Sequence, residues 1–303
     1  MNSVELENVT KTFRDVVAVN DLSLNVPQGC VYGFIGPNGS GKTTTLRMIM
    51  NIFYPDNGLI RVFGEKLHGA CTDRIGYMPE ERGLYKNMKV KEVLQFYGNL
   101  KNGKNIAKEI DYWLKKFDLH PWASKKIETL SKGMSQKVQF IATIISRPEL
   151  VILDEPFTGL DPVNADIIKD AVLDLQKQGT TIIFSTHDMN MAEKMCDFIF
   201  MIFNGKKVLD GTLENIQDKY SSDTLRIRCD DGSAIFSELQ GVEKINNFGH
   251  MHELRLSKNS DPQKVLAEII SKTRIQSFEI AKPSLHNIFV RIVRPEGKED
   301  NDA

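Results

Sequence analysis

The chain has 303 residues, of which 41% are hydrophobic and 26% charged, and its formal net charge is -1. This composition is ordinary for a globular protein of one large or two smaller domains, and it lacks the basic excess of nucleic-acid-binding proteins. No run of 18 apolar residues occurs, and the first residues (MNSVELENVTKTF) do not resemble a signal peptide, so we expect a cytosolic chain without its own membrane span.

In chain order, the first two-thirds of the sequence alternates short apolar runs with helical patterns, which predicts an α/β core. Residues 31–35 (VYGFI), 151–153 (VIL) and 181–184 (TIIF) are rich in β-branched and aromatic residues and predict buried parallel strands. A helix is expected over 43–50. Apolar residues recur at helical spacing over 94–119, which predicts a helical insertion between strand regions.

The composition changes near residue 220, where 219–223 (KYSSD) is polar and is typical of a linker. Beyond it we predict a small α+β domain over 220–294. Its predicted strands are 225–229, 253–256 and 275–280, with a helix over 262–271 and a short final helix from Pro283. The last residues, 295–303, are polar and charged, so we expect them to be disordered.

A glycine-rich motif follows the first predicted strand directly. It reads Gly36-Pro37-Asn38-Gly39-Ser40-Gly41-Lys42-Thr43 and is followed by Thr44, so it fits the pattern G-x-x-x-x-G-K-[ST]. Glycines let the backbone N–H groups wrap closely around phosphates, and the start of the next helix adds partial positive charge. Lys42 supplies a charge for the β- and γ-phosphates, and the Thr43 hydroxyl can bind Mg²⁺, so the motif predicts a P-loop that binds ATP.

Two later strands end in residues suited to ATP hydrolysis. Asp154 and Glu155 follow the strand at 151–153, and His187 follows the strand at 181–184. With a P-loop nearby, Asp154 is placed to hold the Mg²⁺, and Glu155 is placed to polarise the attacking water. His187 is placed on the same rim of the sheet, where it can hold Glu155 and the γ-phosphate in line.

These motifs, together with Leu130-Ser131-Lys132-Gly133-Met134 and Gly159-Leu160-Asp161, give the chain a specific resemblance. Residues 1–219 resemble the ATP-binding subunit of an ATP-binding cassette (ABC) transporter. The resemblance implies a P-loop cassette with an antiparallel β-subdomain and a helical subdomain over about 84–138. It also implies that Phe13 stacks on adenine and that Ser131 and Gly133 contact the γ-phosphate of an ATP held by another subunit.

The sequence departs from the family pattern at two places. The segment Leu130-Ser131-Lys132-Gly133-Met134 corresponds to the signature motif of the family and is called the signature segment below. It carries Lys132 where the family usually has glycine, and we expect that side chain to point to solvent. Glu80 stands where the family has a glutamine; a carboxylate can still bind Mg²⁺, although it cannot donate an amide hydrogen bond. The segment 76–85 (GYMPEERGLY), the SKGM signature and the ending 283–289 (PSLHNIF) are similar to ABC-2-type exporter ATPases of the sodium- and drug-export kind.

The resemblance implies an ATPase that powers export through a separate multi-span membrane permease. It implies a head-to-tail homodimer that closes on ATP, and a peripheral location on the cytoplasmic side of the membrane through the permease. No nucleic-acid partner is expected. The alternative is a non-transport ABC ATPase that acts as a regulatory or conformational switch, or a module that binds nucleotide without hydrolysis. The transported substrate is not encoded in any motif of this chain.

Four cysteines are scattered along the chain, at Cys30, Cys71, Cys196 and Cys229, and no two of them form a CxxC pair. Without a pair at disulfide or zinc-finger spacing, we expect reduced structural thiols and neither a disulfide nor a cysteine metal site.

Overall fold

The computed structural model describes residues 1–81, 83–101, 106–220, 224–229, 236, 239–257 and 260–293. The predicted tail, 295–303, and part of the predicted linker lie outside the described residues. The chain divides into two compact units, Met1–Gly211 and Thr212–Ala303. Each unit has its own hydrophobic core, and each is described by itself below.

The first unit is built on a six-stranded sheet with the order β10-β9-β3-β8-β7-β6, in which β3 pairs in parallel with β8 and β9, and β7 with β6 and β8. The strands are β3 (Val31–Ile35), β6 (Ile75–Met78), β7 (Leu150–Asp154), β8 (Thr181–Thr186), β9 (Phe198–Phe203) and β10 (Lys206–Thr212). Every residue of β3, β7 and β8 is buried, as the unbroken apolar runs predict for strands covered on both faces.

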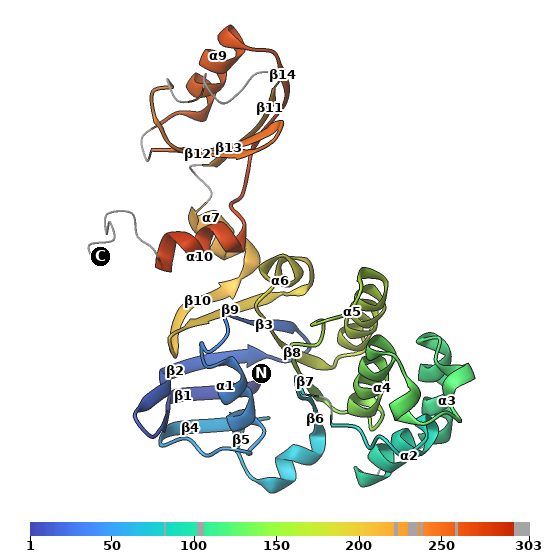
Figure 1. Ribbon diagram of the computed structural model, residues 1–303. Helices are drawn as coiled ribbons and strands as arrows, with labels where there is room; N and C mark the ends of the chain where they lie inside the picture. The colour runs from blue at the N-terminus through green and yellow to red at the C-terminus, as the bar shows by residue number, and fades with distance from the viewer. Residues whose placement is uncertain are drawn as a thin grey trace. The chain divides into compact units, whose positions relative to one another are not determined.

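An antiparallel sheet with the order β2-β1-β4-β5 covers one side of this core (Figure 1). Its strands are β1 (Asn2–Phe13), β2 (Val16–Pro27), β4 (Asn57–Val62) and β5 (Glu65–Lys66), and β5 is followed by the 3-10 helix η1 (Gly69–Arg74). Helix α1 (Lys42–Ile49) contributes Leu46, Met48 and Ile49 to the core shared by the two sheets. The end of β3 and the start of α1 are thereby fixed against each other, with the glycine-rich motif between them.

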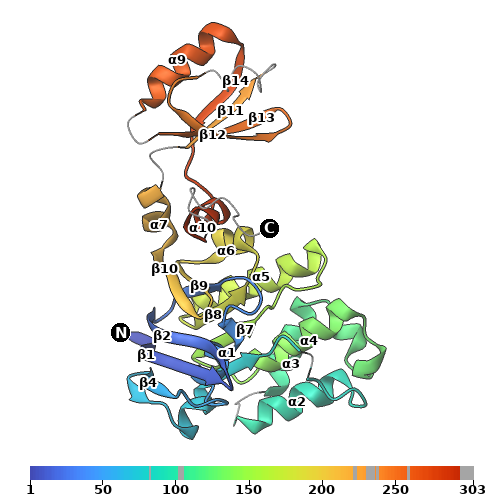
Figure 2. The ribbon, with the colours of Figure 1, turned by 60° about the vertical axis from the view of Figure 1, so that its left-hand side comes forward.

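The other face of the six-stranded sheet packs on helices (Figure 2). These are α2 (Val90–Leu100), α3 (Ile106–Lys116), α4 (Lys132–Ile144) and α5 (Pro162–Lys177), and α6 (Met189–Met195) follows β8. The predicted helical pattern over 94–119 is thus two helices, with Gly103 in the sequence between them. Aromatic side chains fill the centre of the helical region, where Trp113 and Phe117 pack edge to face and Phe117 stacks on Phe140.

The second unit contains an antiparallel sheet with the order β12-β13-β11-β14. Its elements are α7 (Leu213–Tyr220), β11 (Thr224–Cys229), β12 (Val242–Phe248), β13 (Met251–Leu256), α9 (Pro262–Lys272), β14 (Ile275–Ile280) and α10 (Leu285–Val293). Of the six elements that follow α7, five lie where the sequence patterns predicted them, namely β11, β13, α9, β14 and α10. Strand β12 was not predicted. The unit begins at Thr212, before α7, whereas the composition change predicted a boundary after 219; the reason is that α7 contacts α10.

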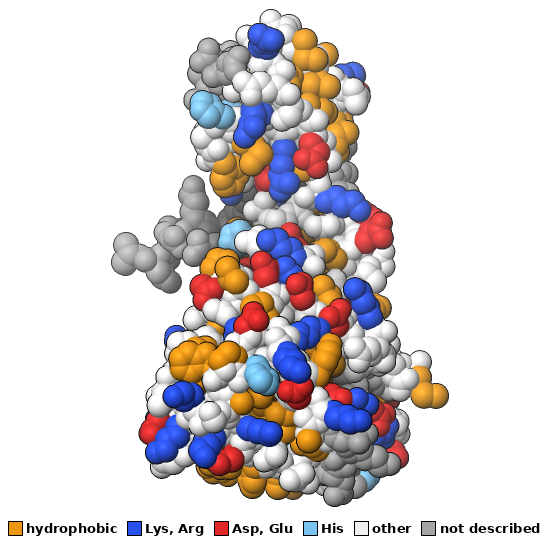
Figure 3. Space-filling view, turned by 90° about the vertical axis from the view of Figure 1, so that its right-hand side faces the viewer, with side chains coloured by type: hydrophobic (Ala, Val, Ile, Leu, Met, Phe, Trp, Pro, Cys, Tyr) orange, Lys and Arg blue, Asp and Glu red, His pale blue; other side chains and the backbone are white. Residues whose placement is uncertain are grey.

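Charged side chains of both signs are mixed on the face shown in Figure 3, as the net charge of -1 leads one to expect. Within the part of the chain that the structure describes, no helix combines the length and the apolar character that crossing a bilayer requires.

Candidate active site

The glycine-rich motif forms a tight loop between β3 and α1. Gly39 and Gly41 have positive φ angles of 76° and 107°, which L-residues with a side chain rarely adopt. Gly36 and Gly41 are also crowded, because a β-carbon on them would lie 2.2 Å from the Ile202 carbonyl oxygen and 2.4 Å from the Ala18 carbonyl oxygen. The fold therefore requires glycine at these positions for backbone reasons alone.

A cavity of about 230 Å³ opens at this loop. It is lined by Ala18, Asn38, Gly39, Ser40, Gly41, Lys42, Thr43, Thr44, Glu80 and Glu155. The structure therefore brings Glu80, from the end of β6, and Glu155, from the end of β7, to the P-loop. The Ser40 hydroxyl is buried and has no hydrogen-bond partner among the described residues, so a polar group entering the loop would satisfy it.

Lys42 lies within the loop, with its side chain only 6% exposed. Its Nζ donates to the Gly36 carbonyl oxygen at 2.7 Å and to the Pro37 carbonyl oxygen at 3.2 Å, and it lies 3.6 Å from Glu155 Oε1. A buried ammonium held by carbonyl groups at the mouth of a backbone N–H cradle is well suited to bind an anionic phosphate group.

Asp154 and Glu155 are adjacent in sequence but interact with different partners. Asp154 Oδ1 accepts from the Ser185 hydroxyl at 2.5 Å and from the Thr43 hydroxyl at 3.2 Å, while its buried Oδ2 has no partner among the described residues. Glu155 has a positive φ of 49°, and its carboxylate lies 3.1 Å from His187 Nδ1 through each oxygen. The left-handed backbone costs about 1 kcal/mol or more at a non-glycine residue, and it turns the chain sharply directly after the strand.

Two side chains that the sequence analysis did not single out complete this arrangement. The Ser185 hydroxyl, which is fully buried, also accepts from the Glu155 N–H at 3.0 Å and so ties both carboxylate residues to β8. The Thr158 hydroxyl donates to Glu155 Oε2 at 3.3 Å. The only signal in the sequence was that Ser185 lies two residues before His187, on the strand beside Asp154.

The geometry offers oxygen ligands of the kind that Mg²⁺ prefers. Thr43 Oγ1 and the unpartnered Oδ2 of Asp154 are hard oxygen donors near the P-loop, and the exposed Glu80 lines the same cavity. These residues fit a magnesium ion that accompanies a nucleotide.

Phe13 ends β1 and remains 40% exposed. Its ring packs edge to face on Phe53, with a centroid distance of 5.3 Å, and Lys11 Nζ lies 5.4 Å from its centroid. Enough of the ring is therefore open to contact a ligand.

The signature segment forms the beginning of α4. Ser131 is the N-cap, and its hydroxyl accepts from the Met134 N–H at 3.2 Å. Gly133 packs closely on Asn164, whose side chain would lie 3.2 Å from a β-carbon at that position. Lys132 is exposed, as expected, yet its ammonium also packs against the backbone at Gly159: a β-carbon on Gly159 would lie 2.5 Å from Lys132 Nζ.

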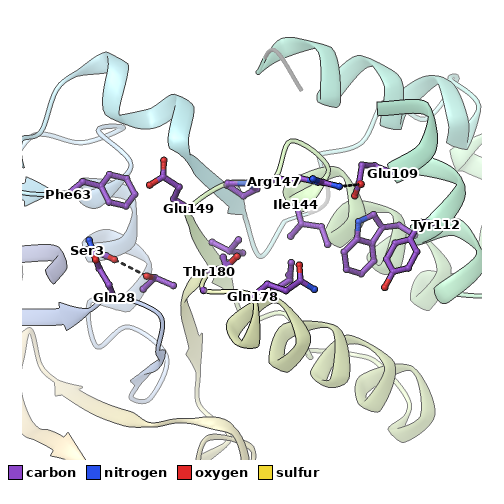
Figure 4. Close-up of a pocket in the computed structure, with 16 residues that line it drawn as sticks. Ser3, Gln28, Phe63, Glu109, Tyr112, Ile144, Arg147, Glu149, Gln178 and Thr180 are labelled. Atoms are coloured by element: carbon purple, nitrogen blue, oxygen red, sulfur yellow. Dashed lines mark hydrogen bonds and ion pairs between the residues drawn. The ribbon is translucent and has the colours of Figure 1, made fainter. Parts of the chain in front are cut away.

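A second cavity, larger than the one at the P-loop, is shown in Figure 4. It has a volume of about 660 Å³ and is lined by residues at the beginnings of β7 and β8, including Glu149 and Thr181, and by Tyr112 of α3. The P-loop follows the opposite, carboxyl end of the parallel strand β3. No P-loop residue lines this larger cavity, so it is separate from the candidate active site.

Comparison with known proteins now decides the family. The family model described as "ABC transporter" matches residues 19–158. The ABC transporter ATP-binding protein YhaQ of Bacillus subtilis (strain 168) is 38% identical over 290 residues, which cover 95% of this chain and 97% of that protein. This chain belongs to the ATP-binding subunits of ABC transporters. It is an ATPase that powers transport through a separate membrane-spanning subunit, as the motifs led us to expect.

The second unit indicates which kind of ABC transporter subunit this chain is. A model described as "ATP-binding protein DrrA1-3-like, C-terminal domain" matches residues 211–293 of this ABC subunit. The Nod factor export ATP-binding protein I of Burkholderia lata is 30% identical over 308 residues, covering 99% of this chain and 98% of that protein. The expected resemblance to the ABC-2-type exporter ATPases is thereby confirmed.

The fold of the cassette is confirmed by solved structures. One is a dimeric ATP-binding cassette in a post-hydrolysis state with ADP and Pi, with a TM-score of 0.64 and 26% identity. The match covers 69% of this chain and 98% of the chain in that structure. The ABC subunit therefore has the α/β P-loop fold that its motifs predict, followed by a second, α+β unit.

Proposed function

We propose that this ABC subunit hydrolyses Mg·ATP at the P-loop and thereby powers export through a multi-span permease. The observation that carries the proposal is that Lys42 and Glu155 line one cavity, while His187 contacts Glu155. Asp154 accepts a hydrogen bond from Thr43 of the same loop. Export, rather than import, is supported by the Nod factor export relative and by the DrrA-like second unit. In this proposal, the permease selects the exported substrate.

In the proposed reaction, the loop from Gly36 to Thr43 holds the phosphates through its backbone N–H groups, with Thr44 at the start of α1 beside them. Lys42 exchanges its present contacts with Gly36, Pro37 and Glu155 for the β- and γ-phosphate oxygens. Thr43 and Asp154, with Glu80 at the cavity wall, are the residues that would hold Mg²⁺. A bound Mg²⁺ would neutralise phosphate charge in the transition state.

Release of Lys42 leaves Glu155 to act on water. His187 lies 3.1 Å from both Glu155 oxygens, so it can fix the carboxylate while Glu155 accepts a proton from the attacking water. We further propose that Phe13 stacks on the adenine. Its exposed ring is anchored by Phe53 and belongs to the sheet whose strand β2 lies against the P-loop at Ala18.

The complete site is proposed to need a second copy of the chain. The N-terminus of α4 presents backbone N–H groups, the Ser131 hydroxyl and a glycine, which together favour a phosphate. Among the described residues of one chain, the Ser131 hydroxyl caps its own helix. A head-to-tail dimer would place this segment on the γ-phosphate of the partner subunit's ATP, so that ATP binding closes the dimer and hydrolysis opens it.

A groove suited to a permease lies between the core and the helical region. A cavity of about 250 Å³ is lined mostly by apolar side chains, among them Met50, Tyr77, Leu84, Tyr97 and Leu100. Large hydrophobic side chains remain exposed on the segments that contribute to it and on nearby segments: Ile52, Tyr54, Tyr85, Phe96 and Leu100. Such a groove fits an amphipathic helix of a membrane partner and supports a peripheral position at the membrane.

Two measurements test the proposal. Lys42→Ala should abolish phosphate release from ATP, whereas the control Lys207→Ala, on an exposed surface lysine, should not; normal turnover by Lys42→Ala would refute the site. Leu100→Glu should prevent co-purification with the co-expressed permease while the isolated subunit still hydrolyses ATP. Tyr112→Glu is the matched control, because Tyr112 on α3 is also more than half exposed. Retention of the permease by Leu100→Glu would reject the groove as the docking surface.

A further inference from the structure

A second group of chemically active side chains lies in the first unit, outside the P-loop cavity. Three residues each offer one donor atom: Glu65 of β5, His68 directly before η1, and Cys71 of η1. These three atoms lie within 4.8 Å of one another. All three come from one seven-residue segment, 65–71 (EKLHGAC). We propose that Glu65, His68 and Cys71 bind a Zn²⁺ ion, with a water molecule as the fourth ligand.

The geometry needs only a small adjustment to hold the metal. Zinc takes a thiolate at about 2.3 Å and nitrogen or oxygen at about 2.0–2.2 Å, so tetrahedral ligand atoms lie roughly 3.3–3.8 Å apart. His68 Nε2 and Glu65 Oε2 are already 3.1 Å apart. Cys71 is buried and fixed, whereas the side chains of His68 and Glu65 are 53% and 63% exposed and can rotate toward it.

The donor types favour zinc over the magnesium that accompanies ATP. A thiolate and an imidazole are soft or intermediate ligands that select Zn²⁺, whereas Mg²⁺ prefers oxygen and keeps its water. The ion's two positive charges would be balanced by the Cys71 thiolate and the Glu65 carboxylate. The neighbouring cation, Arg74, already pairs with Glu149 through Nε at 2.7 Å and Nη2 at 2.6 Å, so its charge is compensated.

The proposed site lies on a segment that also anchors the helical region. Lys101, directly after α2, donates to the carbonyl oxygens of Thr72 and Ile75, which are in η1 and at the start of β6. Burial lowers the pKa of Lys101, as expected for an ammonium enclosed by protein. A metal at Cys71 would therefore stiffen the same turn that receives Lys101.

The experiment is a titration of the full chain, without nucleotide, by Co²⁺ and then by Zn²⁺. We expect one Co²⁺ per chain, with a thiolate-to-metal charge-transfer band that Zn²⁺ removes and a large excess of Mg²⁺ does not. Cys71→Ser should abolish the band. His68→Gln should weaken Zn²⁺ binding by about tenfold or more, since even second-sphere partners of zinc contribute that much.

The chain offers matched controls. His120→Gln removes a similarly exposed histidine that also pairs with a carboxylate, Asp111, and Cys30→Ser removes another buried thiol; both should keep the band and the affinity. If circular dichroism shows that Cys71→Ser does not fold, the Zn²⁺ affinity of His68→Gln, a change at an exposed side chain, tests the proposal instead. The proposal is overturned if the wild type shows no band, if folded Cys71→Ser keeps it, or if His68→Gln binds Zn²⁺ like the wild type. ATP hydrolysis is measured separately, so the fate of the P-loop proposal remains distinguishable.

Discussion

Replacing Ser185 by alanine is the perturbation whose effect follows most directly from the site geometry. The Ser185 hydroxyl is fully buried, donates to Asp154 at 2.5 Å and accepts from the Glu155 N–H at 3.0 Å. Ser185→Ala removes a hydrogen bond to a carboxylate, worth about 1.5–3 kcal/mol, and leaves a buried N–H unsatisfied at a cost of about 1–3 kcal/mol. We therefore expect the free energy of unfolding of the first unit to fall by roughly 2.5–6 kcal/mol.

A second buried serine provides the comparison. Ser3 Oγ shares a hydrogen bond of 2.8 Å with Thr181 Oγ1, at the other end of β8, so its partner is neutral. Ser3→Ala should cost only about 1 kcal/mol. Urea unfolding of both full-length variants, followed by circular dichroism, gives the difference.

Turnover supplies an independent readout of the same variant. Because Ser185 holds Asp154 and Glu155 together, its loss should shift both carboxylates and slow ATP hydrolysis by about 10- to 100-fold, while Ser3→Ala should leave the rate unchanged. Equal destabilisation by the two variants, together with normal turnover in Ser185→Ala, would refute the reasoning that this hydroxyl organises the site.

Two further predictions concern backbone and pH. Gly41→Ala should lower the free energy of unfolding by more than the roughly 1–2 kcal/mol that a left-handed backbone costs a residue with a side chain, because its methyl group would also meet the Ala18 carbonyl oxygen. Gly69→Ala is the control, since a β-carbon there has no atom within 4 Å. Calorimetry that finds the two variants equally stable would contradict this prediction. Burial, assisted by Asp197, raises the pKa of Cys30 to about 12 from 9.0. The unfolded chain therefore loses this proton first, and stability falls by about 1.4 kcal/mol per unit as pH rises from 9 toward 12. Cys30→Ala should fall less steeply between pH 9 and 10.5, and an identical slope would reject the assignment.

The sequence predicted well those parts of the fold whose residues are compatible with only one local structure. The run VYGFI at 31–35 is apolar at every position, so it had to be a strand covered on both faces, and β3 has those bounds. The P-loop was predictable for the same reason, since Gly36 and Gly41 have no room for a side chain.

Other features depend on partners distant in the sequence and left little local signal. Strand β12 (VEKINNF) is an edge strand without a buried residue, so its composition lacks the apolar alternation of a covered strand. Ser185 is an ordinary strand residue until β7 brings Asp154 beside it. The cluster of Glu65, His68 and Cys71 is local, within 65–71, but it has none of the cysteine-pair spacings of known zinc sites, so the sequence pattern did not predict it.

The central claim is that ATP is held between the P-loop of one chain and the Ser131 segment of another. It is tested most directly by the mass in solution of Glu155→Gln, which should bind Mg·ATP without hydrolysing it. We predict a dimer by analytical ultracentrifugation only when Mg·ATP is present. The dimer should be lost in Glu155→Gln with Ser131→Ala and kept with Ser135→Ala, one turn further along α4. A Glu155→Gln chain that stays monomeric with Mg·ATP, or dimerises equally without it, would contradict the account.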